Sequence, residues 1–267
     1  MTDNAYDRSD LEVDLQPNKP HSARFWNALL GGKDNYPADQ ELAEQMSRDF
    51  PYVVDLAVST RAFLKRSVTH LVAQEGYRQF LDIGTGLPTA DNTHEVAQRA
   101  AADCKIVYVD QDPIVLAHAR ALLTSTPEGE TDYIDADLNR PDNVINQARR
   151  TLDLDQPVVL MLMSVIGHVT DHAKAAALVQ TYMSHLAPGS ALVMCTTRST
   201  PEIDAMTRSY ADSGTQPYVA SSEKAMLAMA AGLTIPDPGL GPINRWYPEG
   251  DTGPDVSQWG YVAYKQH

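Results

Sequence analysis

The first part of the chain repeats apolar residues at the three- and four-residue spacing of amphipathic helices. This pattern occupies residues 22–30, stops at Gly31 and returns after Pro37, a residue suited to the first turn of a helix. A longer copy of the pattern covers residues 53–73, so we predict three successive helices. Residues 1–20 are polar and aperiodic, and we expect them to form a flexible arm.

From residue 79 onward, short apolar or β-branched runs alternate with helical patterns. The predicted strands are residues 79–83, 105–109, 131–134, 158–165 and 191–196, with two shorter ones at 233–235 and 261–264. The predicted helices among them are residues 92–101, 114–122, 171–185 and 222–231, with a further helix from Pro201. Strands that alternate with helices at this spacing form βαβ units with parallel pairing. We therefore predict an α/β fold with a Rossmann-like, mostly parallel sheet.

The chain shows no internal repeat and no linker, which predicts a single domain over residues 21–267. Its predicted parts are a helical lid at 21–76, a cofactor-binding core at 77–200 and a C-terminal, substrate-side half at 201–267.

Charge and cysteine content narrow the range of partners. The net charge is −14, from 35 acidic and 21 basic side chains, and so acidic a surface repels nucleic acid and anionic membranes. Cys104 and Cys195 lie in apolar runs and suit free thiols in a reducing compartment. The N-terminus lacks a signal-peptide pattern, and the longest apolar run, 157–167, is shorter than the roughly 20 residues that cross a bilayer. We predict a cytoplasmic protein without a metal site.

A glycine-rich turn, Asp-Ile-Gly-Thr-Gly at residues 82–86, follows the first predicted strand. Glycines at the end of a strand let the backbone turn sharply and approach a ligand closely. Asp110 ends the second strand and Asp137 follows the third, where carboxylates can bind the ribose and the adenine amino group of an adenosine. Each acid alone could be a solvated loop residue or a helix cap. The acids at three successive strand ends together predict an adenosine-type cofactor.

Two positions distinguish the cofactor classes that use this geometry. A dinucleotide site would have a third glycine at position 89, where this chain has Thr89. A pyrophosphate has no use for an acid two residues before the first glycine, whereas Asp82 can attract the positive charge of S-adenosylmethionine. The sequence therefore favours a methyltransferase over an NAD-dependent oxidoreductase.

The segments LDIGTGLPTADNTHEVAQ, VYVDQDPIVLAHARALL and IDADLNRP resemble the cofactor motifs of class I methyltransferases. With HSARFWNALLGGKDNYPAD upstream, residues 20–264 resemble an actinobacterial family of S-adenosylmethionine-dependent methyltransferases formerly classed as a domain of unknown function. The resemblance implies a seven-stranded sheet whose last strand is antiparallel. It also implies contacts to the methionine part (Asp82, Gly84, Gly86), the ribose (Asp110), the adenine (Asp137) and the flanks of the adenine ring (Gln111, Leu138).

A lid is the second predicted part of the site. Residues 24–36 are rich in aromatic and polar side chains, and Arg24 or Tyr36 could reach the cofactor's carboxylate. The same segment could instead be an amphipathic helix on the sheet edge, and Arg61 could take the carboxylate or be a surface residue. The complete predicted cofactor-binding set is Arg24, Tyr36, Asp82, Gly84, Thr85, Gly86, Asn92, Asp110, Gln111, Asp137, Leu138 and Ser164.

Candidates for contact with the methyl acceptor are fewer. His168 follows the fourth strand and could act as a general base or bond a loop carbonyl. Trp246 and Tyr247 could stack on the acceptor or fill the core. His94, at a helix start, is expected to support the helix or touch the cofactor. Residues 164–168 lack the Asn/Asp-Pro-Pro-Tyr/Phe signature of nucleobase and glutamine methylation, which argues against those acceptors.

We thus predict methyl transfer from S-adenosylmethionine to a small-molecule acceptor, with S-adenosylhomocysteine as the product. The alternative is a non-catalytic module that binds S-adenosylmethionine as a sensor. The space beside the methyl group distinguishes them, because an enzyme needs room there and a sensor does not.

Overall fold

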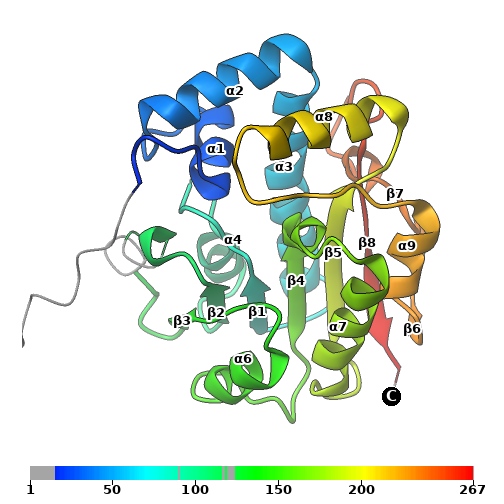
Figure 1. The fold of residues 1–267 in the computed structure, drawn as a ribbon. Coiled ribbons are helices and arrows are strands. Elements are labelled where there is room, and N and C mark those ends of the chain that lie inside the picture. Colours follow the sequence, from blue (N-terminus) through cyan, green and yellow to red (C-terminus); the bar gives the residue numbers. More distant parts are fainter. Residues whose placement is uncertain (1–15, 90, 116–117, 119–123, 267) are drawn as a thin grey trace, which may run out of the picture.

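The computed structural model describes residues 16–89, 91–115, 118 and 124–266 (Figure 1). The predicted arm at 1–20 and the helix predicted at 114–122 lie mostly outside the described residues. The other predicted helices and strands are present, with shifts of a few residues at their ends.

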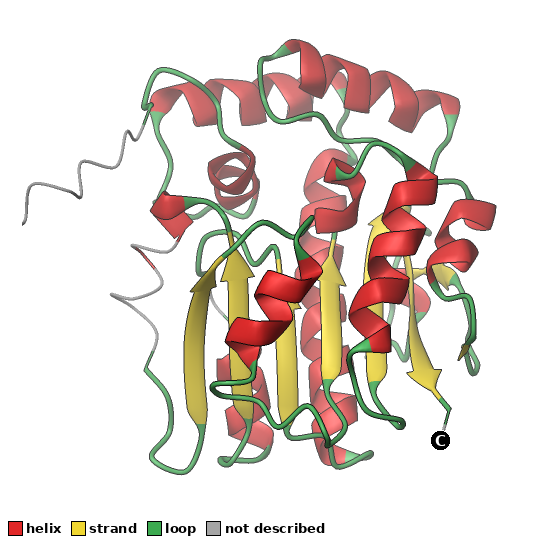
Figure 2. Cartoon of the chain, turned by 60° about the horizontal axis from the view of Figure 1, so that its bottom comes forward, coloured by secondary structure: helices red, strands yellow, loops and turns green. Residues whose placement is uncertain are grey.

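A mixed sheet forms the centre of the molecule (Figure 2). Its strands are β1 (Gln79–Ile83), β2 (Lys105–Asp110), β3 (Glu130–Asp135), β4 (Val159–Met163), β5 (Ala191–Thr197), β6 (Leu233–Thr234), β7 (Gly241–Pro242) and β8 (Gln258–Lys265). Their order is β3-β2-β1-β4-β5-β8-β6, with β7 paired to β8. Strands β1 to β5 pair in parallel, whereas β8 runs antiparallel to β5. The predicted sheet, mostly parallel with an antiparallel last strand, is confirmed, and the two-residue β7 is an addition to it.

Helices cover both faces of the sheet and the edge at which the parallel strands end (Figures 1 and 2). They are α1 (Ser22–Leu29), α2 (Pro37–Asp49), α3 (Val53–Ala73), α4 (Thr93–Ala100), α6 (Pro141–Ala148), α7 (His172–Ser184), α8 (Pro201–Asp212) and α9 (Glu223–Met229), with short 3-10 helices η2 (Val165–His168) and η3 (Ile243–Arg245). Buried side chains of α6, α7 and α9 join one core, and those of α3 and α4 join another on the opposite face. Helix α6 was not predicted from the sequence.

A third apolar cluster lies above the carboxyl ends of the strands, where α1, α2 and the start of α3 meet α8 (Figure 1). Phe25, Met46, Leu56 and Met206 are each buried in it. We call residues 21–49, which contain α1 and α2, the roof. The remainder of the predicted lid, α3, packs on the face of the sheet with Phe63 and Val68 in the core, so only its first turns reach the roof.

The chain reverses its direction across the sheet between β1 and β4. It passes from β1 outward to β2 and β3, then returns to β4 and continues to β5 on the other side. Loops that leave neighbouring strands in opposite directions open a crevice at their carboxyl ends. β4 ends at Met163, two residues before the predicted end, because Ser164 has a φ of 67° and residues 165–168 turn as η2. This turn places residues 164–168 beside the crevice.

Candidate functional site

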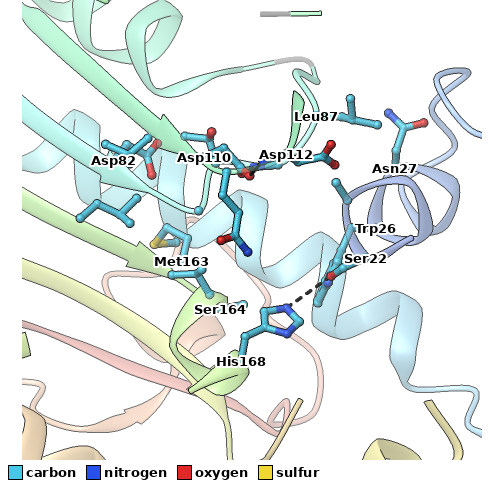
Figure 3. Close-up of a pocket in the computed structure, with 18 of the residues that line it drawn as sticks. Ser22, Trp26, Asn27, Asp82, Leu87, Asp110, Asp112, Met163, Ser164 and His168 are labelled. Carbon is cyan, nitrogen blue, oxygen red and sulfur yellow. Dashed lines mark hydrogen bonds between the residues drawn. The ribbon is translucent and has the colours of Figure 1, made fainter. Parts of the chain in front are cut away.

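A cavity of about 390 Å³ occupies the crevice, beneath α1 (Figure 3). Its floor comes from the segments that follow β1, β2 and β4, and its cover comes from α1 and the start of α3. Nine residues of the predicted site line it, namely Asp82, Gly84, Thr85, Gly86, Asp110, Gln111, Leu138, Ser164 and His168. The topology therefore gathers into one cavity residues that are as much as 86 positions apart, from Asp82 to His168.

The glycine turn after β1 is held closely against the neighbouring strand ends. The Gly84 amide donates a hydrogen bond to the Val109 carbonyl oxygen (2.8 Å). Gly84 has a φ of 73°, and a Cβ at this position would overlap the side chain of Val165 in η2. Only glycine meets both conditions without strain, so the backbone approaches the cavity as the sequence predicts.

Asp110 ties the end of β2 to this turn. Its Oδ2 accepts a hydrogen bond from the Gly86 amide (3.0 Å), and its Oδ1 accepts one from the Asp112 amide (3.0 Å). Burial raises the pKa of Asp110, and these amide donors oppose that shift. The carboxylate therefore fixes the shape of the turn as well as lining the cavity.

Asp82 and Arg61 bring opposite charges to one end of the cavity. Asp82 is 4% exposed, and its Oδ2 accepts a hydrogen bond from Thr93 Oγ1 (2.6 Å). Burial raises the pKa of Asp82 to about 6, although Thr93 and the positive charge of Arg61 oppose the shift. Burial lowers the pKa of Arg61, whose Nη2 donates to the Asp91 carbonyl oxygen (2.8 Å). An ion with both a positive and a negative group fits such a pair better than a singly charged one.

His168 lies at the other side of the cavity and has a defined tautomer (Figure 3). Its Nδ1 is 2.9 Å from the Pro217 carbonyl oxygen, and its Nε2 is 3.4 Å from Ser22 Oγ. A carbonyl oxygen can only accept, so the neutral ring carries its proton on Nδ1 and keeps a lone pair on Nε2. Burial lowers the pKa of His168 and the neighbouring His21 acts in the same direction, while the Pro217 hydrogen bond opposes them. The ring is therefore neutral at pH 7, with Nε2 available to accept a proton.

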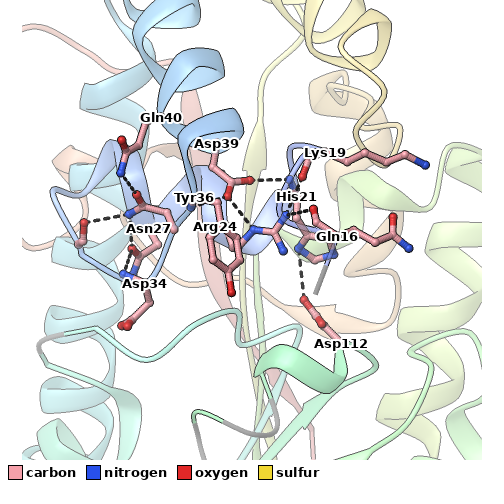
Figure 4. Close-up of polar contacts among 12 residues, drawn as sticks. Gln16, Lys19, His21, Arg24, Asn27, Asp34, Tyr36, Asp39, Gln40 and Asp112 are labelled. Atoms are coloured by element: carbon pink, nitrogen blue, oxygen red, sulfur yellow. Dashed lines mark hydrogen bonds and ion pairs between the residues drawn. The ribbon is translucent and has the colours of Figure 1, made fainter. Parts of the chain in front are cut away.

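Arg24 and Tyr36 belong to the roof and do not line the cavity (Figure 4). Arg24 is 2% exposed, and its Nε donates to Asp39 Oδ2 (2.7 Å). Its Nη2 donates to the Lys19 carbonyl oxygen (2.6 Å), and its guanidinium lies over the Tyr36 ring, 5.0 Å from the centroid. Both residues therefore hold the roof together, and the lining of the cavity gives no support to their predicted contact with a cofactor carboxylate.

Two further residues that were predicted to contact the cofactor, Asn92 and Asp137, use their polar groups in local hydrogen bonds. Asn92 caps α4, and its Oδ1 accepts a hydrogen bond from the Thr89 amide (3.0 Å), so it shapes a small crevice behind the glycine turn. Asp137 Oδ1 accepts from the Asn139 amide (2.8 Å) in a local turn, whereas the adjacent Leu138 does line the cavity. Asp137 is half-buried and lies outside the lining of the cavity, which favours the alternative of a loop acid, and its contact with the adenine stays a prediction.

The aromatic residues near the C-terminus also lie away from the cavity. Trp246 is 5% exposed and packs edge-on against Phe63 (5.5 Å) and His70 (5.6 Å). Tyr247 stacks on His70 at 5.0 Å, and both aromatic residues line a separate surface cavity with Glu75. Core filling, the alternative for Trp246, is correct, and the acceptor contact predicted for this pair is not supported. His94 is also structural, because its amide and Nδ1 both meet Tyr108 Oη (2.8 and 2.9 Å).

The roof and α3 contribute residues that the predicted set lacks. Ser22, Trp26 and Asn27 line the cavity from α1, and Arg61 lines it from α3. The sequence offers Arg61 only as an alternative, since a lone arginine on a helix gives no local signal of its direction. Asp112 was also missed, although its position two residues after Asp110 is a usable signal; its Oδ2 lies 3.2 Å from His21 Nδ1, which joins the roof to the floor.

The part of the chain that the structure describes contains neither a metal-binding cluster nor a membrane-spanning helix. No group of three or more His, Cys, Asp or Glu side chains there could hold a metal ion. None of the helices in the same residues combines the length and the apolar character needed to cross a membrane.

Comparisons with known proteins give a consistent result. Residues 8–266 match the model of the S-adenosyl methyltransferase family. A DUF574 family protein from Streptomyces avermitilis is 37% identical, with a TM-score of 0.89 over 93% of this chain and 98% of the other. A Thermobifida fusca protein, solved as a candidate methyltransferase, is 31% identical, with a TM-score of 0.87 over 98% of this chain and all of the other. An O-methyltransferase family protein from Burkholderia thailandensis shares the fold at 14% identity, with a TM-score of 0.55 over 85% of this chain and 62% of the other. A search of curated proteins gave no match.

Proposed function

The chain belongs to the S-adenosyl methyltransferase family, and we propose that it methylates a hydroxyl group of a small-molecule acceptor, with His168 as the general base. The observation that carries this proposal is the cavity itself, which has the buried Asp82 and the half-buried Arg61 at one side and an unprotonated imidazole nitrogen at the other.

The residues that line the cavity fit S-adenosylmethionine. When bound, this cofactor supplies a methyl group activated by a positively charged sulfur. Asp82 would attract its ammonium group and sulfonium, and Arg61 its carboxylate. Asp110 would accept hydrogen bonds from the ribose hydroxyls, with Gln111 and Leu138 beside the adenine. Because burial disfavours the charged form of Asp82, a cationic ligand beside it would offset the free-energy cost of burying this carboxylate.

His168 would take the proton of the acceptor hydroxyl on Nε2. The Nδ1 hydrogen bond to Pro217 holds the ring in the tautomer and orientation that this role needs. The remaining requirement is alignment of the acceptor oxygen with the methyl carbon and the sulfur, because a methyl group that is already activated needs an in-line nucleophile more than further activation. The carbonyl contact is also the one expected of a structural histidine, so the base role is the point to test.

The shape of the cavity supports an enzyme rather than a sensor. A sensor would close the space around the methyl group, whereas here the cavity continues to Ser22, His168 and Gln216. The charge of −14 supports a small acceptor over nucleic acid or an anionic membrane, and the buried free thiols Cys104 and Cys195 support a cytoplasmic location. The likeness to the Streptomyces and Thermobifida proteins supports an actinobacterial source.

Cofactor binding is tested by calorimetry with S-adenosylmethionine, S-adenosylhomocysteine and NAD. We expect micromolar binding of the first two, lost in Asp110→Ala and kept in Asp135→Ala, which removes an exposed acid at the end of the neighbouring strand. Binding of NAD alone, or of no ligand, would contradict the proposal.

The base role is tested with methyl-labelled cofactor and a panel of hydroxyl-bearing acceptors. His168→Gln should keep cofactor affinity and lower the rate of methyl transfer by about 10²–10⁴-fold. An unchanged rate in this variant would leave the family assignment intact and remove His168 from the mechanism.

A further inference from the structure

A second, smaller cavity of about 40 Å³ adjoins the cofactor cavity. Ser22, Trp26 and His168 line both cavities, so the imidazole stands at their junction. We call the second one the side cavity. It lies under the roof between α1 and α8, where nothing in the cofactor's chemistry requires a space.

The walls of the side cavity are apolar. Phe25, Met46, Leu56 and Met206 line it, and each is at most 7% exposed. Among the described residues, no Asp, Glu, Lys or Arg belongs to its lining. A charged group placed here would lose its hydration without gaining a partner. The two methionines are flexible enough to adapt to ligands of somewhat different shape.

One polar group in this wall lacks a well-formed hydrogen bond. Tyr210 is 7% exposed, and no described residue meets its hydroxyl at ordinary hydrogen-bond distance and angle. Burial raises the pKa of Tyr210, and the hydroxyls of Ser22 and Thr215, which lie near its own, oppose the shift; the hydroxyl therefore keeps its proton at neutral pH. Tyr218, by contrast, meets the hydroxyls of Thr196 and Thr197 (3.1 and 3.2 Å). Buried hydroxyls are normally satisfied, so the one on Tyr210 calls for a ligand.

The groups around the junction converge on one place. Ser22 Oγ is 3.4 Å from His168 Nε2, and Ser22 also lies close enough to Tyr210 to influence its pKa. His168 cannot turn away easily, because its ring packs edge-on against Tyr218 at 5.3 Å. Gly167 makes this packing possible, since a Cβ there would overlap the Tyr218 ring. The structure thus holds a proton acceptor and an unpaired donor near the same point.

We propose that the side cavity receives the apolar body of a small, uncharged alcohol or phenol, whose oxygen binds between His168 Nε2 and the Tyr210 hydroxyl. This inference rests on the proposed function and names its substrate class. The acceptor oxygen forms a bond to the methyl carbon, the carbon–sulfur bond breaks with its electron pair left on sulfur, and the hydroxyl proton passes to His168 Nε2. Tyr210 positions the oxygen for this step, and the apolar wall excludes carboxylates and protonated amines.

Binding of four probes tests the inference, with the protein both loaded with S-adenosylhomocysteine and free of it. 4-Methylphenol and benzyl alcohol are neutral, whereas 4-hydroxybenzoate and tyramine carry a charge on a similar ring. Ligand-observed NMR titration should give at least one neutral probe an affinity about tenfold or more above both charged probes. Equal affinity for neutral and charged probes would overturn the inference.

Two variants and one control locate the binding. Tyr210→Phe should weaken the preferred neutral probe by about tenfold with little effect on the stability of the protein, because the lost hydroxyl makes no hydrogen bond of ordinary geometry. Tyr261→Phe is the control, since its buried hydroxyl donates to the Met226 carbonyl oxygen (3.0 Å) and neither residue lines either cavity; it should lower stability and leave probe binding unchanged. Met206→Trp should fill the side cavity and abolish probe binding.

The outcomes separate this inference from the proposed function. Probe binding that survives both Tyr210→Phe and Met206→Trp would overturn the assignment of the side cavity. Calorimetry with S-adenosylhomocysteine on the same samples reports on the cofactor site alone. Cofactor binding without a preference for neutral probes would therefore reject the substrate class and leave the proposed function standing.

Discussion

His168 Nδ1 donates a hydrogen bond to the Pro217 carbonyl oxygen across 2.9 Å, which leaves Nε2 as the basic atom of the ring. Burial also lowers the pKa of His168 below its ordinary 6.5. A base with a lowered pKa stays unprotonated at neutral pH and loses activity only as the pH falls below 6.5. We expect the acidic limb of the kcat/KM profile there, matched by the NMR titration of the ring signal that His168→Gln removes. A limb above pH 7 would contradict this prediction.

Asp82 is expected to lower stability while it supports cofactor binding. Its folded-state pKa of about 6 lies above the ordinary 3.8, so the folded protein holds its proton more tightly and loses stability as the pH rises from about 4 to about 6. This difference corresponds to about 3 kcal/mol at pH 8. Asp82→Asn should therefore raise the free energy of unfolding in the absence of cofactor, by up to that amount, and weaken S-adenosylmethionine binding. Urea unfolding at pH 5 and pH 8 checks it, since the gain should grow with pH.

Asp39 should be essential to the roof. It is fully buried, and it accepts hydrogen bonds from the His21 amide (2.8 Å), the Tyr36 amide (2.9 Å) and Arg24 Nε (2.7 Å). Asp39→Ala leaves the buried Arg24 charge without its carboxylate, at a cost of about 3–5 kcal/mol. Thermal unfolding with and without S-adenosylhomocysteine measures this loss. Glu44→Ala, which breaks an exposed pair with Arg48, is the control and should cost at most about 0.5 kcal/mol; similar losses in both variants would argue against a buried role for Asp39.

Alanine substitutions at Gly84 and Gly76 distinguish the cost of backbone strain from the cost of steric overlap. Both have a positive φ, of 73° and 79°, but a Cβ at Gly84 would overlap Val165, whereas a Cβ at Gly76 would meet open space. Gly76→Ala should cost about 1–2 kcal/mol through strain alone. Gly84→Ala should cost about 1–3 kcal/mol more, because Val165 must move, and should weaken cofactor binding. Denaturant unfolding of the two variants gives the comparison, and equal losses would mean that Val165 yields freely.

The sequence predicts those parts of the site that depend on local signals. Gly84, Gly86 and Asp110 stand at strand ends, where the periodicity already shows that the chain must turn. The paired strands were predictable for the same reason. The pairing of Arg24 with Asp39, on the next helix, could not be predicted, because neither the direction nor the burial of a helical arginine has a local signal.

The other features that the sequence does not predict depend on contacts between residues far apart in the chain. The sequence does not decide whether Trp246 fills the core or lines a pocket, because the answer depends on its contact with Phe63 on α3. The early end of β4 depends on the left-handed conformation of Ser164, whose Oγ accepts a hydrogen bond from Gln258 on the last strand. Tyr210 gave no sequence signal, because an unpartnered hydroxyl is defined only by what surrounds it.

The position of α3 also bears on how the chain folds. Phe63 and Val68 pack in the same core as Val193 of β5 and Val262 of β8, so the first long helix finds its full partner surface only on strands synthesised near the end of the chain. Contacts of such high sequence separation form slowly, and helices that wait for them keep apolar faces exposed during synthesis. Helix α3 therefore completes its packing only after these late strands have been made. A chain that stops before β8 would leave the cover of the cofactor cavity without the sheet face on which α3 rests.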